Sequence, residues 1–100
     1  MSELKVVRFA ATRQFAKAMA KLSPKQQARV KAALGLALND IASPQLRLHG
    51  LKGDWLGAYS LDAGGDLRIL FDAVDELNDD GSTVTVGNLI TVGTHSQIYG

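Results

Sequence analysis

The end of the chain carries side chains that can do acid–base chemistry. Residues 93–100 read Gly-Thr-His-Ser-Gln-Ile-Tyr-Gly and follow the apolar run of residues 89–92. A histidine such as His95 can accept and donate protons, while Tyr99 offers a ring for stacking and a hydroxyl for hydrogen bonding. The alternative is structural, with His95 capping a strand while Ile98 and Tyr99 fold back to seal the core.

Three further residues can complete such a site. Asp66 and Arg68 are two positions apart on a predicted strand, so their side chains share one face. Arginine suits phosphate because its planar guanidinium binds two oxygens at once. His49 lies in a segment punctuated by glycines. The alternatives are an ordinary ion pair between Asp66 and Arg68 and an ordinary loop histidine at position 49.

Metal and thiol chemistry receive little support from the sequence. The chain has no cysteine, which excludes disulfides, thiol catalysis and thiolate metal sites. A metal-dependent hydrolase built on His49, Asp66 and His95 would need ligands from three distant segments, without a local His-x-x-x-His spacing. We therefore predict no metal site and no cofactor.

Charge is divided unevenly along the chain. Residues 1–52 carry ten basic and two acidic side chains, a net charge of +8, whereas the remainder carries one basic and eight acidic side chains, a net charge of −7. A positive surface raises the local concentration of phosphates. We therefore interpret the basic half as a surface for a polyanionic partner rather than as charges that only contact solvent. The basic residues expected to contact RNA are Arg13, Lys17, Lys21, Lys25, Arg29 and Lys52.

Apolar spacing predicts the elements that position these groups. A strand is expected at residues 4–9. A first helix should follow it, capped by Thr12, and a second helix should start at Ser23-Pro24 and run to about Asn39. Three strands follow at residues 55–61, 66–74 and 83–92, with a bulge expected at residues 87–88. The side chains expected between the helices and one sheet face, with Arg68 on the open face, are Phe15, Met19, Leu22, Val30, Leu34, Leu38, Ile69 and Phe71.

The element order predicts the fold class. It is an α+β fold, with an N-terminal strand, a two-helix hairpin and a three-stranded antiparallel meander in one sheet, the helices packed on one face. A length of 100 residues predicts one domain, 1–100. The chain has no apolar run long enough to span a membrane and no signal-peptide pattern at its start, so we expect no membrane association and a cytoplasmic protein.

This pattern resembles toxins of the RelE/ParE superfamily of bacterial toxin–antitoxin systems, and in particular its YafQ-like ribonuclease branch. The resemblance covers nearly the whole chain and rests on several segments in the same order. The matching segments are Phe15 and Lys17 in the first helix, residues 49–53 (His-Gly-Leu-Lys-Gly), Trp55 and Gly57, the strand at 66–71, and residues 93–100.

The resemblance implies a RelE-like fold and a toxin that cleaves mRNA on the ribosome through the neighbouring 2′-hydroxyl. It implies no cofactor, an antitoxin as a partner besides ribosome and mRNA, and a toxin–antitoxin hetero-oligomer. Two positions depart from the branch: Asp62 stands in place of a histidine and Thr91 in place of an arginine.

The resemblance also assigns roles within the site. His49, Asp66, His95 and Tyr99 match functional positions of the YafQ-like branch, and Arg68 matches an arginine that holds phosphate in RelE-type members. His49 or Asp66 is then the base, His95 the acid and Arg68 the cation, while Tyr99 stacks on a nucleobase. The alternatives are a ParE-type gyrase inhibitor, which needs no proton shuttle, and a weakly active or inactive homologue that still binds an antitoxin.

Overall fold

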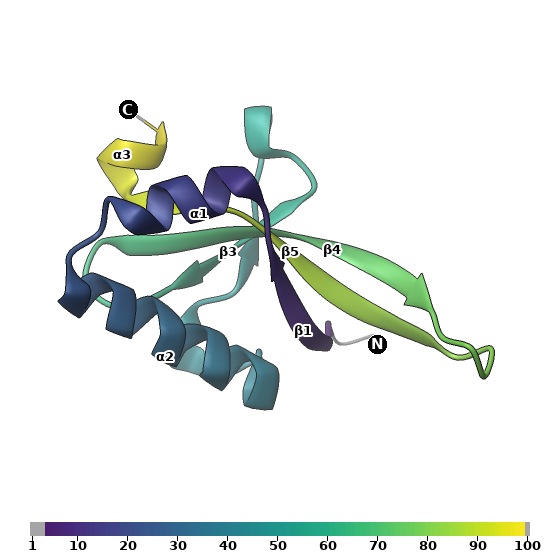
Figure 1. The fold of residues 1–100 in the computed structure, drawn as a ribbon. Helices are drawn as coiled ribbons and strands as arrows, with labels where there is room; N and C mark the ends of the chain where they lie inside the picture. Colours follow the sequence, from purple (N-terminus) through teal and green to yellow (C-terminus); the bar gives the residue numbers. More distant parts are fainter. Residues whose placement is uncertain (1–3, 100) are drawn as a thin grey trace.

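The computed structural model describes residues 4–99, which form one mixed sheet with helices against it (Figure 1). Gly100, the last residue of the predicted terminal segment, lies outside the described residues. In chain order the elements are β1 (Val6–Ala11), α1 (Arg13–Ala20), α2 (Pro24–Asp40), a 3₁₀ turn (Pro44–Leu46), β2 (His49–Gly50), a second 3₁₀ turn (Gly53–Trp55), β3 (Ala58–Asp62), β4 (Leu67–Leu77), β5 (Thr83–Thr94) and α3 (His95–Tyr99).

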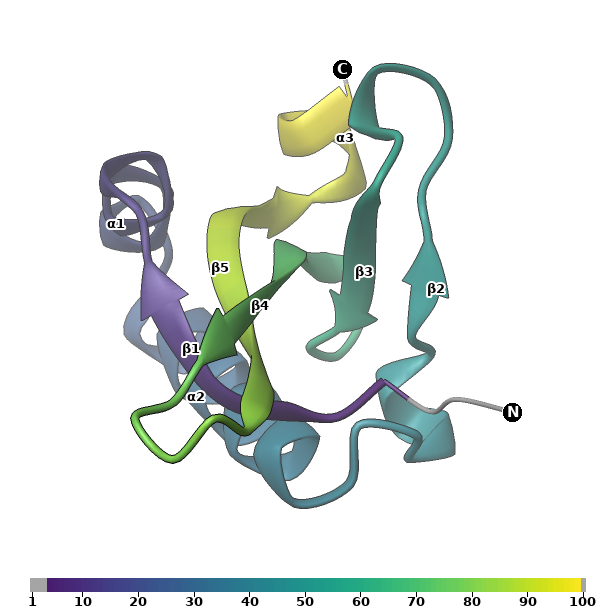
Figure 2. The ribbon, with the colours of Figure 1, turned by 90° about the vertical axis from the view of Figure 1, so that its right-hand side faces the viewer.

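The sheet has the strand order β1-β5-β4-β3-β2. β1 runs parallel to β5, and every other neighbouring pair is antiparallel. The helices α1 and α2 follow β1 and pack against the sheet, and α3 follows the end of β5 (Figure 2). Residues of α1 and α3 line a common pocket, so α3 lies close to α1 (Figure 1). This arrangement confirms the predicted N-terminal strand, helical hairpin and meander. It adds the short edge strand β2, because the segment around His49 was not predicted to form a strand.

Both long helices begin where their capping residues predict. The hydroxyl of Thr12 accepts a hydrogen bond from the Phe15 amide at 3.1 Å and donates one to the Leu89 carbonyl at 2.7 Å, which ties the start of α1 to β5. Ser23 and Gln26 cap each other's backbone amides at 3.1 and 3.0 Å. Within residues 4–99, no helix is long and apolar enough to cross a membrane.

The core lies between the two long helices and the sheet. Phe15, Leu22, Val30, Ile69 and Phe71 are buried there as predicted, and Met19 and Leu34 pack partly buried against them. The prediction for Leu38 is wrong, because this side chain is 45% exposed. After Val30 the fully buried side chains of α2 are Ala33 and Ala37, each one residue before the expected Leu34 and Leu38, so the buried stripe is turned away from Leu38. It consists of Val30, Ala33 and Ala37, and Ile41 continues it beyond the helix.

Two strand predictions need correction. Trp55 does not begin a strand but closes a 3₁₀ turn, because Gly53 and Gly57 on either side adopt φ angles of +68° and +96°. β3 therefore starts at Ala58. The irregularity in β5 is not at residues 87–88: Leu70 pairs with Thr91 and Phe71 pairs with Leu89, so Ile90 between them has no partner on β4.

Gly87 has a packing role instead. A Cβ atom at this position would lie 2.5 Å from Cδ1 of Phe9 and 3.2 Å from Cδ2 of Phe71. The two phenyl rings meet edge to face with centroids 5.5 Å apart. The absence of a side chain at position 87 is what lets the β1 ring pack over β5.

Candidate functional site

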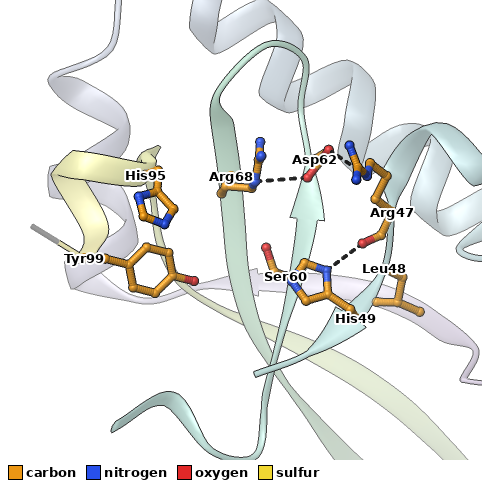
Figure 3. A pocket seen from close by; sticks show the side chains of 8 residues that line it. All are labelled: Arg47, Leu48, His49, Ser60, Asp62, Arg68, His95 and Tyr99. Carbon is orange, nitrogen blue, oxygen red and sulfur yellow. Dashed lines mark hydrogen bonds and ion pairs between the residues drawn. The ribbon is translucent and has the colours of Figure 1, made fainter. Parts of the chain in front are cut away.

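The sheet face opposite α1 and α2 carries polar side chains. Along β3, Ser60 and Asp62 alternate with the core residue Leu61, and along β4 Arg68 alternates with the core residues Leu67 and Ile69. The predicted position of Arg68 on the open face is therefore confirmed. A pocket of about 680 Å³ lies on this face (Figure 3), lined by Arg47, Leu48, His49, Ser60, Asp62, Arg68, His95 and Tyr99.

Strand register brings the polar groups of the pocket together. Ser60 of β3 lies opposite His49 of β2, and Asp62 of β3 lies opposite Arg68 of β4. Residues opposite each other in an antiparallel pair point to the same face. These four side chains therefore form one group, although the chain separates His49 from Arg68 by a turn and a complete strand.

Arg68 is held firmly. Its Nε lies 3.1 Å from Oδ1 of Asp62, and its Nη1 donates hydrogen bonds to the carbonyl oxygens of Gly65 and Leu67 at 3.2 and 3.3 Å. Its side chain is 23% exposed. A guanidinium fixed in this way presents its remaining N–H donors in a set direction, which suits binding of a phosphate.

His49 is oriented by the backbone of its own segment. Its Nδ1 lies 2.8 Å from the carbonyl oxygen of Arg47, a residue in the left-handed region with φ +48°. When the neutral ring donates from Nδ1 to that carbonyl, Nε2 carries a free lone pair. This geometry gives His49 the form that a general base needs.

The helix α3 presents His95 and Tyr99 together. They are four residues apart, hence on one helix face, and their ring centroids lie 4.8 Å apart. The helix starts with a reciprocal cap, in which Gln97 N donates to Thr94 Oγ1 at 3.3 Å and Thr94 N donates to Gln97 Oε1 at 2.7 Å. Both rings are exposed, so Tyr99 does not seal the core as the structural alternative requires.

Asp66 has a different place from the other predicted catalytic residues. It does not line the pocket, and its Oδ2 accepts a hydrogen bond from the backbone amide of His95 at 3.3 Å. This contact ties the turn before β4 to the start of α3. The ordinary Asp66–Arg68 ion pair is not formed, because Arg68 pairs with Asp62. The pocket thus gathers His49, Arg68, His95 and Tyr99, while Asp66 supports the helix that carries two of them.

Sequence reasoning missed several lining residues, among them Arg47 and Ser60. Ser60 shares the strand parity of Asp62, which was available as a signal once β3 was placed. The hydroxyl of Ser60 is buried and has no hydrogen-bond partner within the described residues. Leaving a buried hydroxyl without a hydrogen-bond partner costs about 1–3 kcal/mol. An unpaired hydroxyl at this buried strand position is therefore unusual.

The predicted RNA-contacting residues are all exposed, but they do not line this pocket. Arg13, Lys17 and Lys21 belong to α1, Lys25 and Arg29 belong to α2, and Lys52 lies in the loop before the second 3₁₀ turn. Lys17 and Lys21 also line a second pocket of about 470 Å³ together with Val92 of β5 and Ile98 of α3. The basic helical surface, formed by these arginines and lysines of α1 and α2, therefore lies outside the pocket of the catalytic candidates, although its α1 part adjoins α3, which carries His95 and Tyr99.

The geometry gives no support to a metal-dependent hydrolase. Among residues 4–99, no three histidine or carboxylate side chains come together as possible ligands of a metal ion. The acidic group in the pocket, Asp62, faces Arg68 and Arg47 instead, at 3.1 and 3.8 Å.

Neither protein-family models nor curated proteins match this chain. Its fold is similar to several solved structures. YafQ from E. coli superposes with a TM-score of 0.67 at 20% identity, covering 92% of this chain and 97% of that one. A chain of the RelBE2 toxin–antitoxin complex from Mycobacterium tuberculosis gives 0.61 at 20% identity, with coverages of 90% and 99%. The YoeB/ParE toxin from Agrobacterium tumefaciens gives 0.66 at 12% identity, with coverages of 88% and 98%. These likenesses confirm the predicted RelE-like fold.

Proposed function

We propose that this protein is the toxin of a toxin–antitoxin system, a single-domain cytoplasmic endoribonuclease that cleaves mRNA on the ribosome without a metal cofactor. The observation that carries the proposal is the pocket that gathers His49, Arg68, His95 and Tyr99 from β2, β4 and α3. The fold supports it, because the solved structures similar to this chain are RelE-, YafQ- and ParE-type toxins. Together the pocket and the fold favour RNA cleavage.

In this mechanism the RNA supplies its own nucleophile. His49 Nε2 removes the proton of a 2′-hydroxyl, whose oxygen attacks the adjacent phosphorus and forms a phosphorane. Arg68 offsets the negative charge that develops on the non-bridging oxygens. His95 donates a proton to the leaving 5′-oxygen, so the products are a 2′,3′-cyclic phosphate and a 5′-hydroxyl. Tyr99 stacks on a nucleobase and orients the strand.

The exposed cations supply affinity rather than chemistry. Phosphate contacts by lysine and arginine position a nucleic acid without reading its sequence. The basic helical surface, with Lys52, is suited to ribosomal RNA, while the separate pocket holds the mRNA. This division gives two surfaces of the molecule separate roles.

The test of the mechanism is an mRNA with a single 2′-deoxyribose at the nucleotide that is cleaved, assayed on ribosomes. We expect the ordinary mRNA to be cut and the deoxy mRNA to stay intact, because the nucleophile is missing. Cleavage of the deoxy mRNA would contradict the 2′-hydroxyl mechanism and favour an activated water.

Residue roles are tested by His95→Ala and Arg68→Ala, which should abolish both cleavage and growth arrest. The loss of a proton-transfer group costs about 10²- to 10⁴-fold in rate. Arg8→Ala is the matched control, since Arg8 is exposed on β1 and, among residues 4–99, pairs with Glu76 outside the pocket. Growth arrest that survives both substitutions without any RNA cleavage would favour the gyrase-inhibitor alternative.

The proposed antitoxin is tested in cells. An acidic, partly disordered segment can fold onto a cationic surface, and the basic half of this chain offers one. We expect growth arrest when the toxin is expressed alone and normal growth when the adjacent gene is expressed with it. Equal growth arrest in both cases would contradict an antitoxin encoded there.

A further inference from the structure

The hydroxyl of Ser60 is the one buried side-chain oxygen or nitrogen in residues 4–99 that lacks a hydrogen-bond partner. Ser60 is 1% exposed and lines the pocket that holds the catalytic candidates. Figure 3 shows its oxygen directed into the space between Arg68 and the His95–Tyr99 pair. A buried hydroxyl that faces a pocket and has no partner in the free protein is ready to bond to a ligand.

Two polar neighbours of Ser60 direct hydrogen-bonding groups to other partners. His49, opposite Ser60, directs Nδ1 to the Arg47 carbonyl. Asp62, two residues further along the same face, directs its two oxygens to Arg68 and Arg47. Within residues 4–99 the Ser60 hydroxyl has no partner, and a molecule that enters the pocket can supply one.

Strand register places Ser60 between the residues that we assign to the 2′-hydroxyl and to the phosphate of the RNA. Ser60 lies beside His49, which takes the 2′-hydroxyl proton in the proposed mechanism. On its other side lies the Asp62–Arg68 pair, where the phosphate is held. A ribose and its 3′-phosphate that reach from His49 to Arg68 must pass over Ser60.

We propose that Ser60 is a substrate-positioning residue whose hydroxyl donates a hydrogen bond to a non-bridging oxygen of the RNA phosphate bound by Arg68. This inference rests on the proposed function for the identity of the substrate. A hydroxyl donor and an anionic oxygen form a short, strong hydrogen bond. The oxygen of Ser60 is closed off from solvent in the free protein, so an adjoining side chain shifts on binding. His95 and Tyr99 are exposed and can move without disturbing the core.

The first measurement is binding of adenosine 3′-monophosphate to the purified protein and to Ser60→Ala, by calorimetry. We expect the affinity to fall about 10- to 100-fold, the effect of losing one hydrogen bond to a charged group. The melting temperature should stay the same or rise, because alanine removes an unpaired buried hydroxyl. Ser43→Ala is the control, since Ser43 precedes a 3₁₀ turn, makes no capping hydrogen bond and does not line the pocket.

The second measurement identifies the oxygen that Ser60 contacts. A phosphorothioate at the cleaved linkage replaces one non-bridging oxygen by sulfur, a weaker acceptor. We expect one of the two diastereomers to be cut more slowly by the wild-type protein. In Ser60→Ala this difference should become smaller, and the rate on the ordinary mRNA should be lower. A purely structural serine would leave the difference between diastereomers unchanged.

The outcomes separate this inference from the proposed function. The inference is wrong if Ser60→Ala binds the nucleotide as tightly as the wild type or if it loses thermal stability. It is also wrong if the wild type does not bind the nucleotide at all. If the wild type binds the nucleotide more tightly than Ser60→Ala but does not cleave mRNA on ribosomes, the binding role of Ser60 stands and the proposed function is wrong.

Discussion

Asp62 Oδ1 lies 3.1 Å from Arg68 Nε, so the arginine that we assign to phosphate is already paired with a carboxylate in the free protein. The side chain of Asp62 is only 12% exposed, and its second oxygen faces Nε of Arg47 at 3.8 Å. A carboxylate at this place repels an incoming phosphate and competes with it for Arg68. The pocket therefore contains its own competitor for the substrate.

Asp62→Asn should release Arg68 from this competition. We expect the affinity for adenosine 3′-monophosphate and the cleavage rate to rise about tenfold, which corresponds to about 1.4 kcal/mol. The free energy of unfolding should fall by about 1–2 kcal/mol, between the values for exposed and buried charge pairs. Calorimetry, mRNA cleavage and thermal unfolding measure the three effects.

Asp54→Asn is the matched control for Asp62→Asn, because Asp54 is exposed in the second 3₁₀ turn and does not line the pocket. It should change neither binding nor cleavage. A lower cleavage rate in Asp62→Asn would show instead that the carboxylate is needed to hold Arg68 in its working position.

Asp66 should behave as a cap rather than as a base. Its carboxylate accepts the hydrogen bond of the His95 amide, a role that asparagine can take over. We expect Asp66→Asn to retain cleavage within about twofold. Asp66→Ala should weaken the start of α3 and lower the free energy of unfolding by about 0.5–2 kcal/mol, the usual effect of losing a helix cap. It should also slow cleavage, because the rings of His95 and Tyr99 are then misplaced.

A catalytic base at position 66 would give a different result. Both substitutions would then lower the rate by about 10²- to 10⁴-fold, because neither asparagine nor alanine can remove a proton. The comparison of asparagine with alanine, assayed by mRNA cleavage, decides between His49 and Asp66 as the base.

The parts of the fold predicted from sequence are those fixed by local chemistry. Thr12 and Ser23 set the helix starts because a cap needs only residues within one turn. The burial of Ile69 and Phe71 followed from strand alternation, and so did the open-face position of Arg68.

Contacts that depend on register or on turn geometry could not be predicted. Asp66 immediately precedes the first residue of β4, so strand alternation does not fix its direction, and it points to the start of α3. The pairing of Asp62 with Arg68 depends on the β3–β4 register, which the sequence did not determine. The roles assigned to His49, His95 and Tyr99 came from the resemblance to a toxin family, and the structure adds that these residues share a pocket.

Gly87→Ala should destabilise the fold. The added Cβ would lie 2.5 and 2.6 Å from two atoms of the Phe9 ring, which must shift away from its edge-to-face contact with Phe71. Overpacking of this kind costs about 1–3 kcal/mol. Chemical denaturation measures the change in the free energy of unfolding.

Gly35→Ala is the opposite control. Gly35 lies within α2, and a Cβ there meets nothing within 4 Å. Alanine is favoured over glycine inside a helix by about 0.5–1 kcal/mol, so this variant should be more stable than the wild type. Equal effects of the two substitutions would contradict the packing role of Gly87.

The basic helical surface and the pocket should be separable by mutation. Simultaneous substitution of Lys17, Lys21 and Lys25 by alanine should weaken ribosome binding and flatten its dependence on salt. The slope of log affinity against log salt falls by about 0.7–0.9 for each phosphate that the variant no longer neutralises.

His95→Ala is the reciprocal control, because it should bind ribosomes with the affinity and salt dependence of the wild type while cleaving no mRNA. Titration of labelled protein with ribosomes at several salt concentrations gives both quantities. If the triple variant keeps the wild-type affinity and slope, the lysines of α1 and α2 form only a solvated surface, and the protein reaches the ribosome through another face.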